Sequence, residues 1–175
     1  MSKAVLISIR PKWVQKIAND EKTIEVRKTK PKLETPFKCY IYCTLPKYPH
    51  EDFIATDYPM PQFYGGGKVV GEFTCDRIYE LAPLNHAPDD VEKQACLTRE
   101  EIVNYLKGTG HGWHITDLLI YDHPRELTEF RRATDPCDSC HAEYTWECTD
   151  CKKLGGDIKR PPQSWCYVEA MKDGN

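Results

Sequence analysis

Residues 4–27 read AVLISIRPKWVQKIANDEKTIEVR, and their periodicity changes three times. Residues 4–9 alternate with the period of a β-strand, so every second apolar side chain lies on one face. Pro11 then stands where the first turn of a helix tolerates proline, and the apolar residues after it have helical spacing. Residues 19–22 form a polar turn, and residues 23–28 return as a strand. The stretch therefore predicts a strand, a helix and a second strand.

The rest of the chain adds mostly strands. Further strands are predicted at residues 38–44, 68–79, 113–121 and 165–170, a capping box at Thr98–Glu101 begins a helix that runs through Leu106, and loops are predicted at 29–37 and 45–66. Gly71 marks a bulge or a close approach within its strand. This order lacks the regular alternation of a doubly wound sheet. It favours an α+β fold, a small and mostly antiparallel β pseudo-barrel flanked by helices.

Length and composition limit the class of protein. The chain has 175 residues, which suits one domain spanning residues 1–175. With 40% hydrophobic and 29% charged residues, it is neither disordered nor fibrous. It contains no run of 18 apolar residues, so no membrane-spanning helix is expected. The first apolar stretch is too short for a signal peptide, and we therefore expect a cytoplasmic protein.

Charge is distributed unevenly along the chain. Residues 1–40 carry ten Lys and Arg but four Asp and Glu, whereas the whole chain has a net charge of −3. A basic segment on an acidic body can attract a polyanion locally. The alternative is a basic surface that is merely solvated.

Nine cysteines are present, and four of them form the pattern Cys137-x2-Cys140-x7-Cys148-x2-Cys151 inside a predicted insert at residues 134–160. Each C-x-x-C unit places two thiolates on one tight turn, and two units complete a tetrahedral site for Zn²⁺. Four protein ligands leave no open position, so this zinc would be structural. An iron–sulfur cluster, His141 as a replacement ligand, a redox pair and free cysteines are the alternatives. The remaining cysteines, Cys39, Cys43, Cys75, Cys96 and Cys166, are predicted to be small buried hydrophobic residues.

The turn ahead of the second strand carries a family pattern. Lys22, Glu25 and Arg27 follow the order K-x-x-E-x-R, and Asp20 stands where the pattern G-x-K-x-x-E-x-R has glycine. The sequence in this respect resembles the ASCH domains of the PUA-like superfamily. Asp tolerates a tight-turn backbone, so the turn is expected to survive the exchange.

Four other segments extend the resemblance. They read SIRP at residues 8–11, GKVVGEF at 67–73, GWHI at 112–115 and PQSWCYV at 162–168, and together they are similar to a prophage-type branch of ASCH proteins. The similarity covers about residues 4–130 and 161–170. It implies a PUA-like pseudo-barrel with a cleft for RNA or a nucleotide. Fold alone does not decide the activity.

Eight residues are candidates for the cleft. They are Lys22 and Glu25 as acid–base residues, and Ser8, Arg10, Arg27, Trp113, His114 and Trp165 as ligand-binding residues. The arginines would grip phosphate and the tryptophans would stack on a base. Each assignment has a structural alternative, because ion pairs also hold strands together and tryptophans also fill cores.

A nucleoside hydrolase is the main alternative function, either an N4-acylcytidine amidohydrolase-like enzyme or a ribonuclease. In the amidohydrolase branch a lysine acts with a threonine three positions later and with a distant glutamate. Lys22 matches the lysine, but Glu25 holds the threonine position, and Thr23 is displaced along the strand. The candidates for the distant glutamate are Glu72, Glu100 and Glu101. A protein-interaction module built on the insert and on loop 45–66 is a third possibility.

Overall fold

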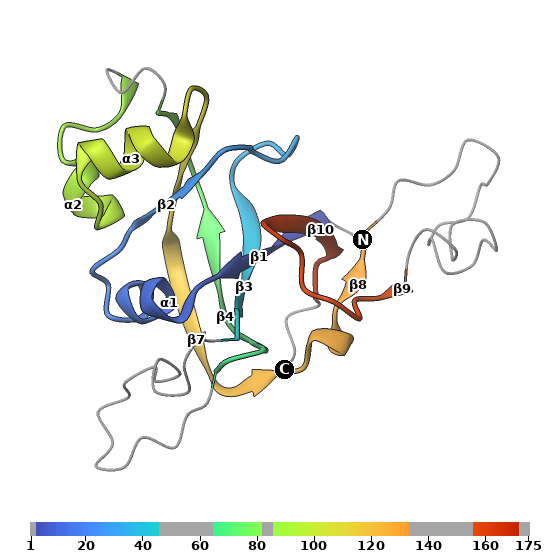
Figure 1. Ribbon diagram of the computed structural model, residues 1–175. Coiled ribbons are helices and arrows are strands. Elements are labelled where there is room, and N and C mark those ends of the chain that lie inside the picture. Colours follow the sequence, from blue (N-terminus) through green and yellow to red (C-terminus); the bar gives the residue numbers. More distant parts are fainter. Residues whose placement is uncertain (1–2, 46–64, 82–85, 134–155, 172–175) are drawn as a thin grey trace, which may run out of the picture.

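The computed structural model describes residues 3–45, 65–81, 86–133 and 156–171. Its elements are β1 (Lys3–Ile9), α1 (Pro11–Ala18), β2 (Ile24–Arg27), β3 (Phe37–Cys43), β4 (Lys68–Cys75), β5 (Ile78–Glu80), α2 (Val91–Ala95), α3 (Arg99–Leu106), β6 (His111–His114), β7 (Thr116–Arg125), the short 3-10 helix η3 (Leu127–Glu129), β8 (Arg131–Arg132), β9 (Gly156–Asp157) and β10 (Trp165–Glu169). Figure 1 shows their arrangement.

The strands form two sheets. One has seven strands in the order β7-β4-β3-β1-β10-β8-β9, and the other has three in the order β2-β6-β5. Strands β1 and β3 run parallel, whereas the other pairings in the described residues are antiparallel. Few helices accompany these strands. The predicted α+β class with a mostly antiparallel pseudo-barrel is confirmed.

Two predicted strands are each divided in the structure. Residues 68–79 form β4 and β5, and residues 113–121 form the end of β6 and the beginning of β7. In each case the chain leaves one sheet and enters the other. The prediction of one continuous strand was wrong in both places. Both halves of each segment have strand periodicity, and periodicity does not report which sheet a strand joins. These crossings link the two sheets.

Gly71 provides both features that were predicted for it. The register of β4 against β7 shifts between Val69 and Gly71, which marks an irregularity of the bulge type. A Cβ atom at Gly71 would lie 2.5 Å from the carbonyl oxygen of Leu119. Only glycine allows β4 and β7 to approach this closely.

Both faces of β1 are buried. Val5, Ile7 and Ile9 belong to one apolar cluster, and Ala4 and Leu6 belong to a second cluster on the opposite face. A third cluster joins β2 to α2 and α3; its members are Ile24, Val26, Leu81, Val91, Ala95, Ile102 and Leu106. The alternation predicted from residues 4–9 is present, but β1 is a central strand and exposes neither face.

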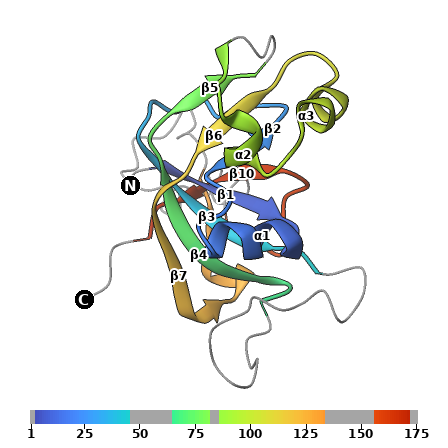
Figure 2. The ribbon, with the colours of Figure 1, turned by 90° about the vertical axis from the view of Figure 1, so that its left-hand side faces the viewer.

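The helices lie on one side of the strands. Figure 2 shows α1 across the large sheet, and α2 and α3 beside β2 and β6. Helix α3 begins with the predicted capping box, in which the Thr98 hydroxyl accepts from the Glu101 N–H at 3.2 Å and the Glu101 carboxylate accepts from the Thr98 N–H at 2.8 Å. Helix α2 was not predicted, because five residues give too little periodicity to distinguish a helical turn from a loop.

Four of the five cysteines outside the C-x-x-C pairs are buried, as predicted; Cys96 is partly exposed. Burial raises the pKa of the Cys39 thiol, and it raises that of Cys75 to about 12. The four proposed zinc ligands lie outside the described residues, and within the described residues no group of three or more His, Cys, Asp or Glu could hold a metal. Residues 156–157, at the end of the predicted insert, form β9 and pair with β8.

Candidate functional site: a charged cavity between two helices

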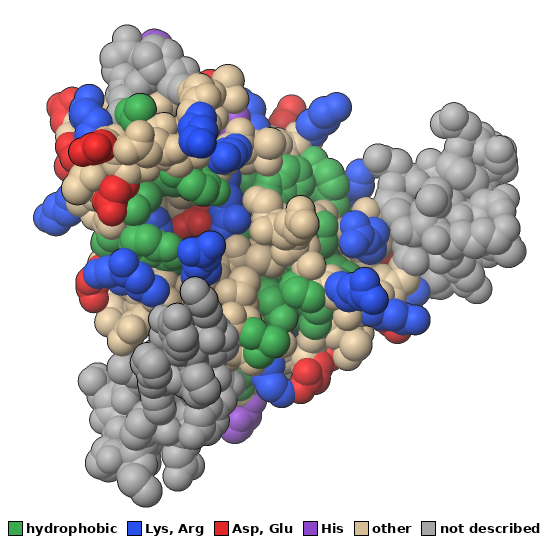
Figure 3. Space-filling model, viewed as in Figure 1, with side chains coloured by type: hydrophobic (Ala, Val, Ile, Leu, Met, Phe, Trp, Pro, Cys, Tyr) green, Lys and Arg blue, Asp and Glu red, His purple; other side chains and the backbone are tan. Residues whose placement is uncertain are grey.

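A cavity of about 620 Å³ opens between α1 and α3. It is lined by Ser8, Arg10, Trp13, Lys22, Glu25, Val26, Arg27, Thr44, Leu97, Glu101, Tyr105, Pro161, Pro162 and Gln163. Figure 3 shows this hollow with acidic and basic side chains inside it and hydrophobic side chains above and below. Five of the eight residues predicted for the cleft are among these lining residues.

Strand β2 supplies the charged interior of the cavity. Its alternation directs Ile24 and Val26 into the apolar cluster with α2 and α3. Glu25 and Arg27 therefore point to the opposite face, and both side chains are less than a tenth exposed. Two charged residues are thus held on a short strand, where the backbone limits their movement.

The turn before β2 supplies Lys22. Asp20 has a φ of 56°, a left-handed conformation that favours glycine and that Asp tolerates better than most residues. The family pattern has glycine at this position, and the structure confirms that Asp20 preserves the tight turn. The chain consequently enters β2 with the Lys22 side chain directed inward, where it is 2% exposed.

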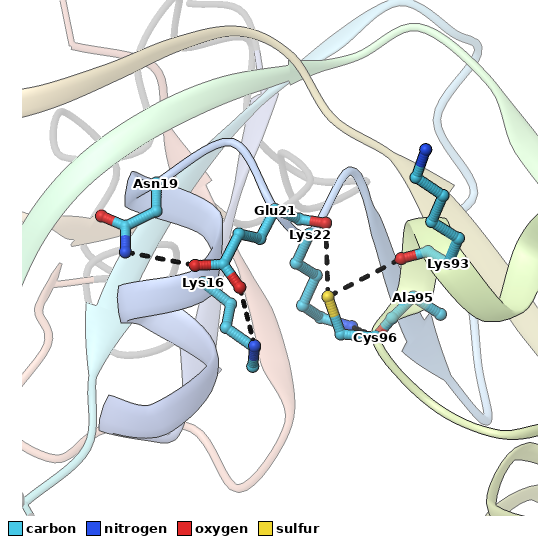
Figure 4. A network of polar contacts seen from close by, with 7 residues as sticks. All are labelled: Lys16, Asn19, Glu21, Lys22, Lys93, Ala95 and Cys96. Carbon is cyan, nitrogen blue, oxygen red and sulfur yellow. Dashed lines mark hydrogen bonds and ion pairs between the residues drawn. The ribbon is translucent and has the colours of Figure 1, made fainter.

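A network of polar contacts locks this turn against the end of α2 (Figure 4). The Lys16 ammonium group lies 2.8 Å from the Glu21 carboxylate. The Cys96 thiol donates to the Glu21 carbonyl oxygen at 3.2 Å, and the Lys22 ammonium group donates to the Ala95 carbonyl oxygen at 2.7 Å. The tight turn at Asp20 and the hydrogen bond to the end of α2 therefore fix the position of the Lys22 side chain.

Glu25 lies between two cations. One of its carboxylate oxygens lies 3.4 Å from Lys22 Nζ, and the other lies 2.9 Å from an Arg27 terminal nitrogen. All three side chains are buried. The cluster consists of two formal positive charges and one negative charge, and it therefore has a net charge of +1 in a poorly solvated place. A buried positive charge without a full counter-charge favours an anionic ligand.

Arg27 has further contacts that fix its guanidinium group. One terminal nitrogen donates to the Ser8 carbonyl oxygen at 2.6 Å, and the other donates to the Ser164 hydroxyl at 3.2 Å. Its Nε–H is buried and has no hydrogen-bond partner among the described residues. Buried N–H donors are normally paired, so this donor is a feature that a ligand or a water molecule would satisfy.

Two aromatic side chains line the cavity from opposite helices, Trp13 from α1 and Tyr105 from α3. Lys22 Nζ lies 5.2 Å from the centre of the Trp13 ring, and Lys28 Nζ lies 5.3 Å from the centre of the Tyr105 ring. Tyr105 is 46% exposed, unusually open for a large hydrophobic residue. These rings and their cations offer stacking surfaces to a planar ligand.

The structure does not bring all the predicted residues together. Trp113 is fully buried and packs against Phe37 at a ring distance of 5.9 Å. His114 lies elsewhere, with its Nδ1 2.7 Å from an Asp76 carboxylate oxygen. Trp165 packs against Trp113 and donates its indole N–H to Thr29 at 3.0 Å. Trp113 therefore fills the core, Trp165 and His114 are partly exposed, and none of the three lines the cavity.

The residues considered for a hydrolase are also separated. Glu101 lines the cavity together with Lys22, whereas Glu72 pairs with Lys38 at 2.9 Å and does not line it. The Thr23 hydroxyl is directed to Gln94 at 3.3 Å and is absent from the lining. Of the three candidates for the distant glutamate, the cavity contains Glu101.

Comparisons with known proteins support the fold. No protein-family model and no curated protein matches the chain. The solved structures of ZmASCH from Zymomonas mobilis match across most of the chain. A tyrosine-to-phenylalanine variant aligns with a TM-score of 0.59 and 16% identity, covering 96% of this chain and 91% of that one. The unsubstituted protein aligns with a TM-score of 0.58 and 17% identity, covering 95% of this chain and 87% of that one.

The molecule is accordingly a mixed β pseudo-barrel with a charged cavity between flanking helices. Its fold is that of an ASCH domain, the family that residues 20–27 resemble. At this level of identity the likeness concerns the fold, and activity must be argued from the cavity.

Proposed function

We propose that this chain binds RNA or a nucleotide in the cavity between α1 and α3. The observation that carries the proposal is the buried cluster of Lys22, Glu25 and Arg27, whose net charge is positive and which faces a cavity with aromatic walls. A nucleotide combines the two properties that such a site selects, a negative phosphate and a planar base.

The lining residues divide these tasks. Arg10 is exposed at the cavity and Arg27 is buried in it, so both can donate to phosphate oxygens. Trp13 and Tyr105 provide faces for a base, and each stacked base contributes about 1–3 kcal/mol. The ASCH fold supports the same assignment, because the resemblance implies a cleft for RNA or a nucleotide in this part of the domain.

Binding of a fluorescein-labelled single-stranded RNA, followed by fluorescence anisotropy, tests the proposal. Tyr105→Ala removes an exposed wall of the cavity, and the matched control Val103→Ala truncates another exposed side chain of the same helix outside the lining. Loss of one stacked base should weaken binding about 5- to 150-fold in Tyr105→Ala. Val103→Ala should bind like the wild type.

A second pair of variants tests the charged interior. Lys22→Met removes a buried charge that lines the cavity, and Lys16→Met removes a partly exposed lysine from the same region of the chain. Unfolding in urea is measured alongside, so that lost binding is distinguished from lost structure. Wild-type protein without affinity for RNA or nucleotides would contradict the proposal. It would also be contradicted if Lys22→Met and Tyr105→Ala both bound RNA as tightly as the wild type.

A hydrolase acting on a modified nucleoside, or a ribonuclease, is the alternative that one observation favours, since Lys22 and Glu101 line the same cavity. Incubation with N4-acetylcytidine and with single-stranded RNA, followed by liquid chromatography and mass spectrometry, decides between binding and turnover. Products from the wild type that disappear in Lys22→Ala would make the chain an enzyme. Intact substrates in both samples would leave binding as its function.

We also propose a structural zinc ion at Cys137, Cys140, Cys148 and Cys151. The support is the sequence pattern, whose two C-x-x-C pairs match the spacing of closed zinc sites. Thiolate metal sites suit a reducing compartment, so we place the protein in the cytoplasm. Elemental analysis of the purified protein should find one zinc per chain, and Cys140→Ser should lose it. Iron with visible absorption, or no metal, would contradict the assignment.

A further inference from the structure

A basic strip lies on the same face of the molecule as the cavity and has no role in the site described above. We define it as Arg131 and Arg132 of β8 together with Lys159 and Arg160, all of which are exposed. Figure 3 shows Lys and Arg side chains gathered over β8 and β9, on the same face as the hollow. In the sequence, the basic strip is distant from the basic residues 1–40.

The main chain connects the basic strip to the cavity. Arg160 directly precedes residues 161–163, which line the cavity. Between Lys159 and β9, Ile158 is buried and donates its N–H to the Phe130 carbonyl oxygen at 2.9 Å. The four basic residues therefore stand on a backbone that is tied to η3 and β8 and that continues into the cavity rim.

Acidic residues reduce the charge of the basic strip without cancelling it. Asp157 lies opposite Arg131 in the register of β8 and β9. Glu169 of β10 lies 4.0 Å from Arg131, and its side chain is 14% exposed. Among the described residues, four cations against two carboxylates leave a positive surface, which attracts a polyanion that also reaches the cavity.

We propose that the basic strip binds the phosphates of a single-stranded RNA, one nucleotide of which occupies the cavity. This inference rests on the proposed function and adds that the preferred ligand is an oligomer. The backbone between Gln163 and Asp157 spans at most about 20 Å, which limits the contacted length to a few nucleotides. The cavity takes an unpaired nucleotide, so a duplex of the same length should bind less well.

Competition by oligouridylates, from uridine monophosphate up to about ten nucleotides, tests this inference through displacement of a labelled RNA. The strip variant is the double substitution Lys159→Gln and Arg160→Gln, and a second strip variant is Arg131→Gln with Arg132→Gln. The matched control is Lys93→Gln with Lys107→Gln, which removes two exposed charges from α2 and the end of α3, at the opposite side of the molecule (Figure 1).

In the wild type, affinity should rise with oligomer length and then level off. Each strip variant should bind the oligomer about 25-fold more weakly at about 0.1 M salt, because two lost phosphate contacts reduce the slope of log affinity against log salt by about 1.4. Uridine monophosphate should bind the strip variants as it binds the wild type, and the control should behave like the wild type in both assays.

The failures of the two proposals are distinguishable. If uridine monophosphate and the oligomer bind the wild type equally, or if the strip variants leave oligomer binding unchanged, the basic strip does not bind RNA. The proposal that the cavity binds a nucleotide is then unaffected. If the strip variants weaken oligomer binding but Tyr105→Ala does not, the basic strip binds RNA and the assignment of the cavity as a nucleotide site is wrong. Equal affinities for the single strand and for a duplex of the same length would also overturn the inference, because a paired nucleotide could not enter the cavity.

Discussion

Asp20 adopts a left-handed backbone at the turn that directs Lys22 into the cavity. Glycine adopts this conformation without steric cost, whereas for Asp the Cβ atom makes the conformation less favourable. We expect Asp20→Gly to raise the free energy of unfolding by up to about 1 kcal/mol, with unchanged ligand binding. Urea unfolding checks this result. Asn19→Gly is the control, because Asn19 has a φ of −90° and gains nothing from glycine; equal effects of the two changes would contradict the assignment.

Glu25 holds two buried cations together, and its removal should be costly. Glu25→Gln leaves Lys22 and Arg27 buried without their shared carboxylate. We expect the free energy of unfolding to fall by about 3–5 kcal/mol, as for other broken buried ion pairs. Thermal and urea unfolding measure the change.

The control is Glu21→Gln, which breaks the solvated pair with Lys16 and should change stability little. A Glu25→Gln protein as stable as the wild type would show that the cluster does not need its counter-charge, and would weaken the electrostatic basis of the site.

At the level of residues, sequence predicted the charged part of the cavity well. Lys22, Glu25 and Arg27 follow from a motif whose spacing reflects a turn and a strand face, and the structure places all three at the cavity. Trp13 and Tyr105 were missed. Trp13 is one of the apolar residues after Pro11 whose spacing predicted a helix, and that pattern does not indicate a cavity wall. The sequence around Tyr105 gives no sign that the end of α3 faces α1. The approach of two helices that are distant in sequence depends on tertiary packing, which local sequence patterns do not report.

The β5–β6 pair contains a pH-sensitive element. Burial lowers the pKa of His111, with Lys30 acting in the same direction and Glu80 opposing both. A histidine whose pKa is lower in the folded than in the unfolded chain binds fewer protons when folded, so its contribution to stability is present above the unfolded pKa of about 6.5 and is lost as the pH falls below it. Stability should therefore decrease as the solution is acidified below this value.

Urea unfolding of wild type and His111→Gln at about pH 8 and about pH 5 measures this contribution. The wild type should lose more stability on acidification than His111→Gln. His123→Gln, which removes an exposed histidine of β7, should behave like the wild type. A steeper loss in His111→Gln than in the wild type would contradict the assigned direction.

At the level of elements, sequence predicted the order and type of most strands. It failed where continuous strand periodicity passes from one sheet to the other, between β4 and β5 and between β6 and β7. The side-chain pattern is similar on both sides of such a crossing, and the bend is produced by contacts with strands distant in sequence. Hydrogen bonds from His114 N to the Arg77 carbonyl and from Ile115 N to the Thr23 carbonyl hold these crossings.

Across the whole molecule, two basic regions lie on the face that carries the cavity. The first comes from residues 1–40, which contribute Arg10, Lys22 and Arg27 to the lining. The second is the basic strip, which the overall net charge of −3 conceals. No helix among the described residues is long and apolar enough to cross a membrane. This arrangement of charge, which composition alone cannot show, supports the proposal that an acidic chain binds a polyanion.

Photochemical cross-linking of a single-stranded RNA that contains 4-thiouridine, followed by mass spectrometry of the linked peptides, tests most directly whether RNA occupies this cavity. Peptides that contain Trp13 or Tyr105 should carry the cross-linked nucleotide, and an excess of unlabelled oligomer should remove the signal. Cross-links confined to other parts of the surface, such as β7, or RNA that never binds the protein, would contradict the central claim that the cavity between α1 and α3 is the binding site.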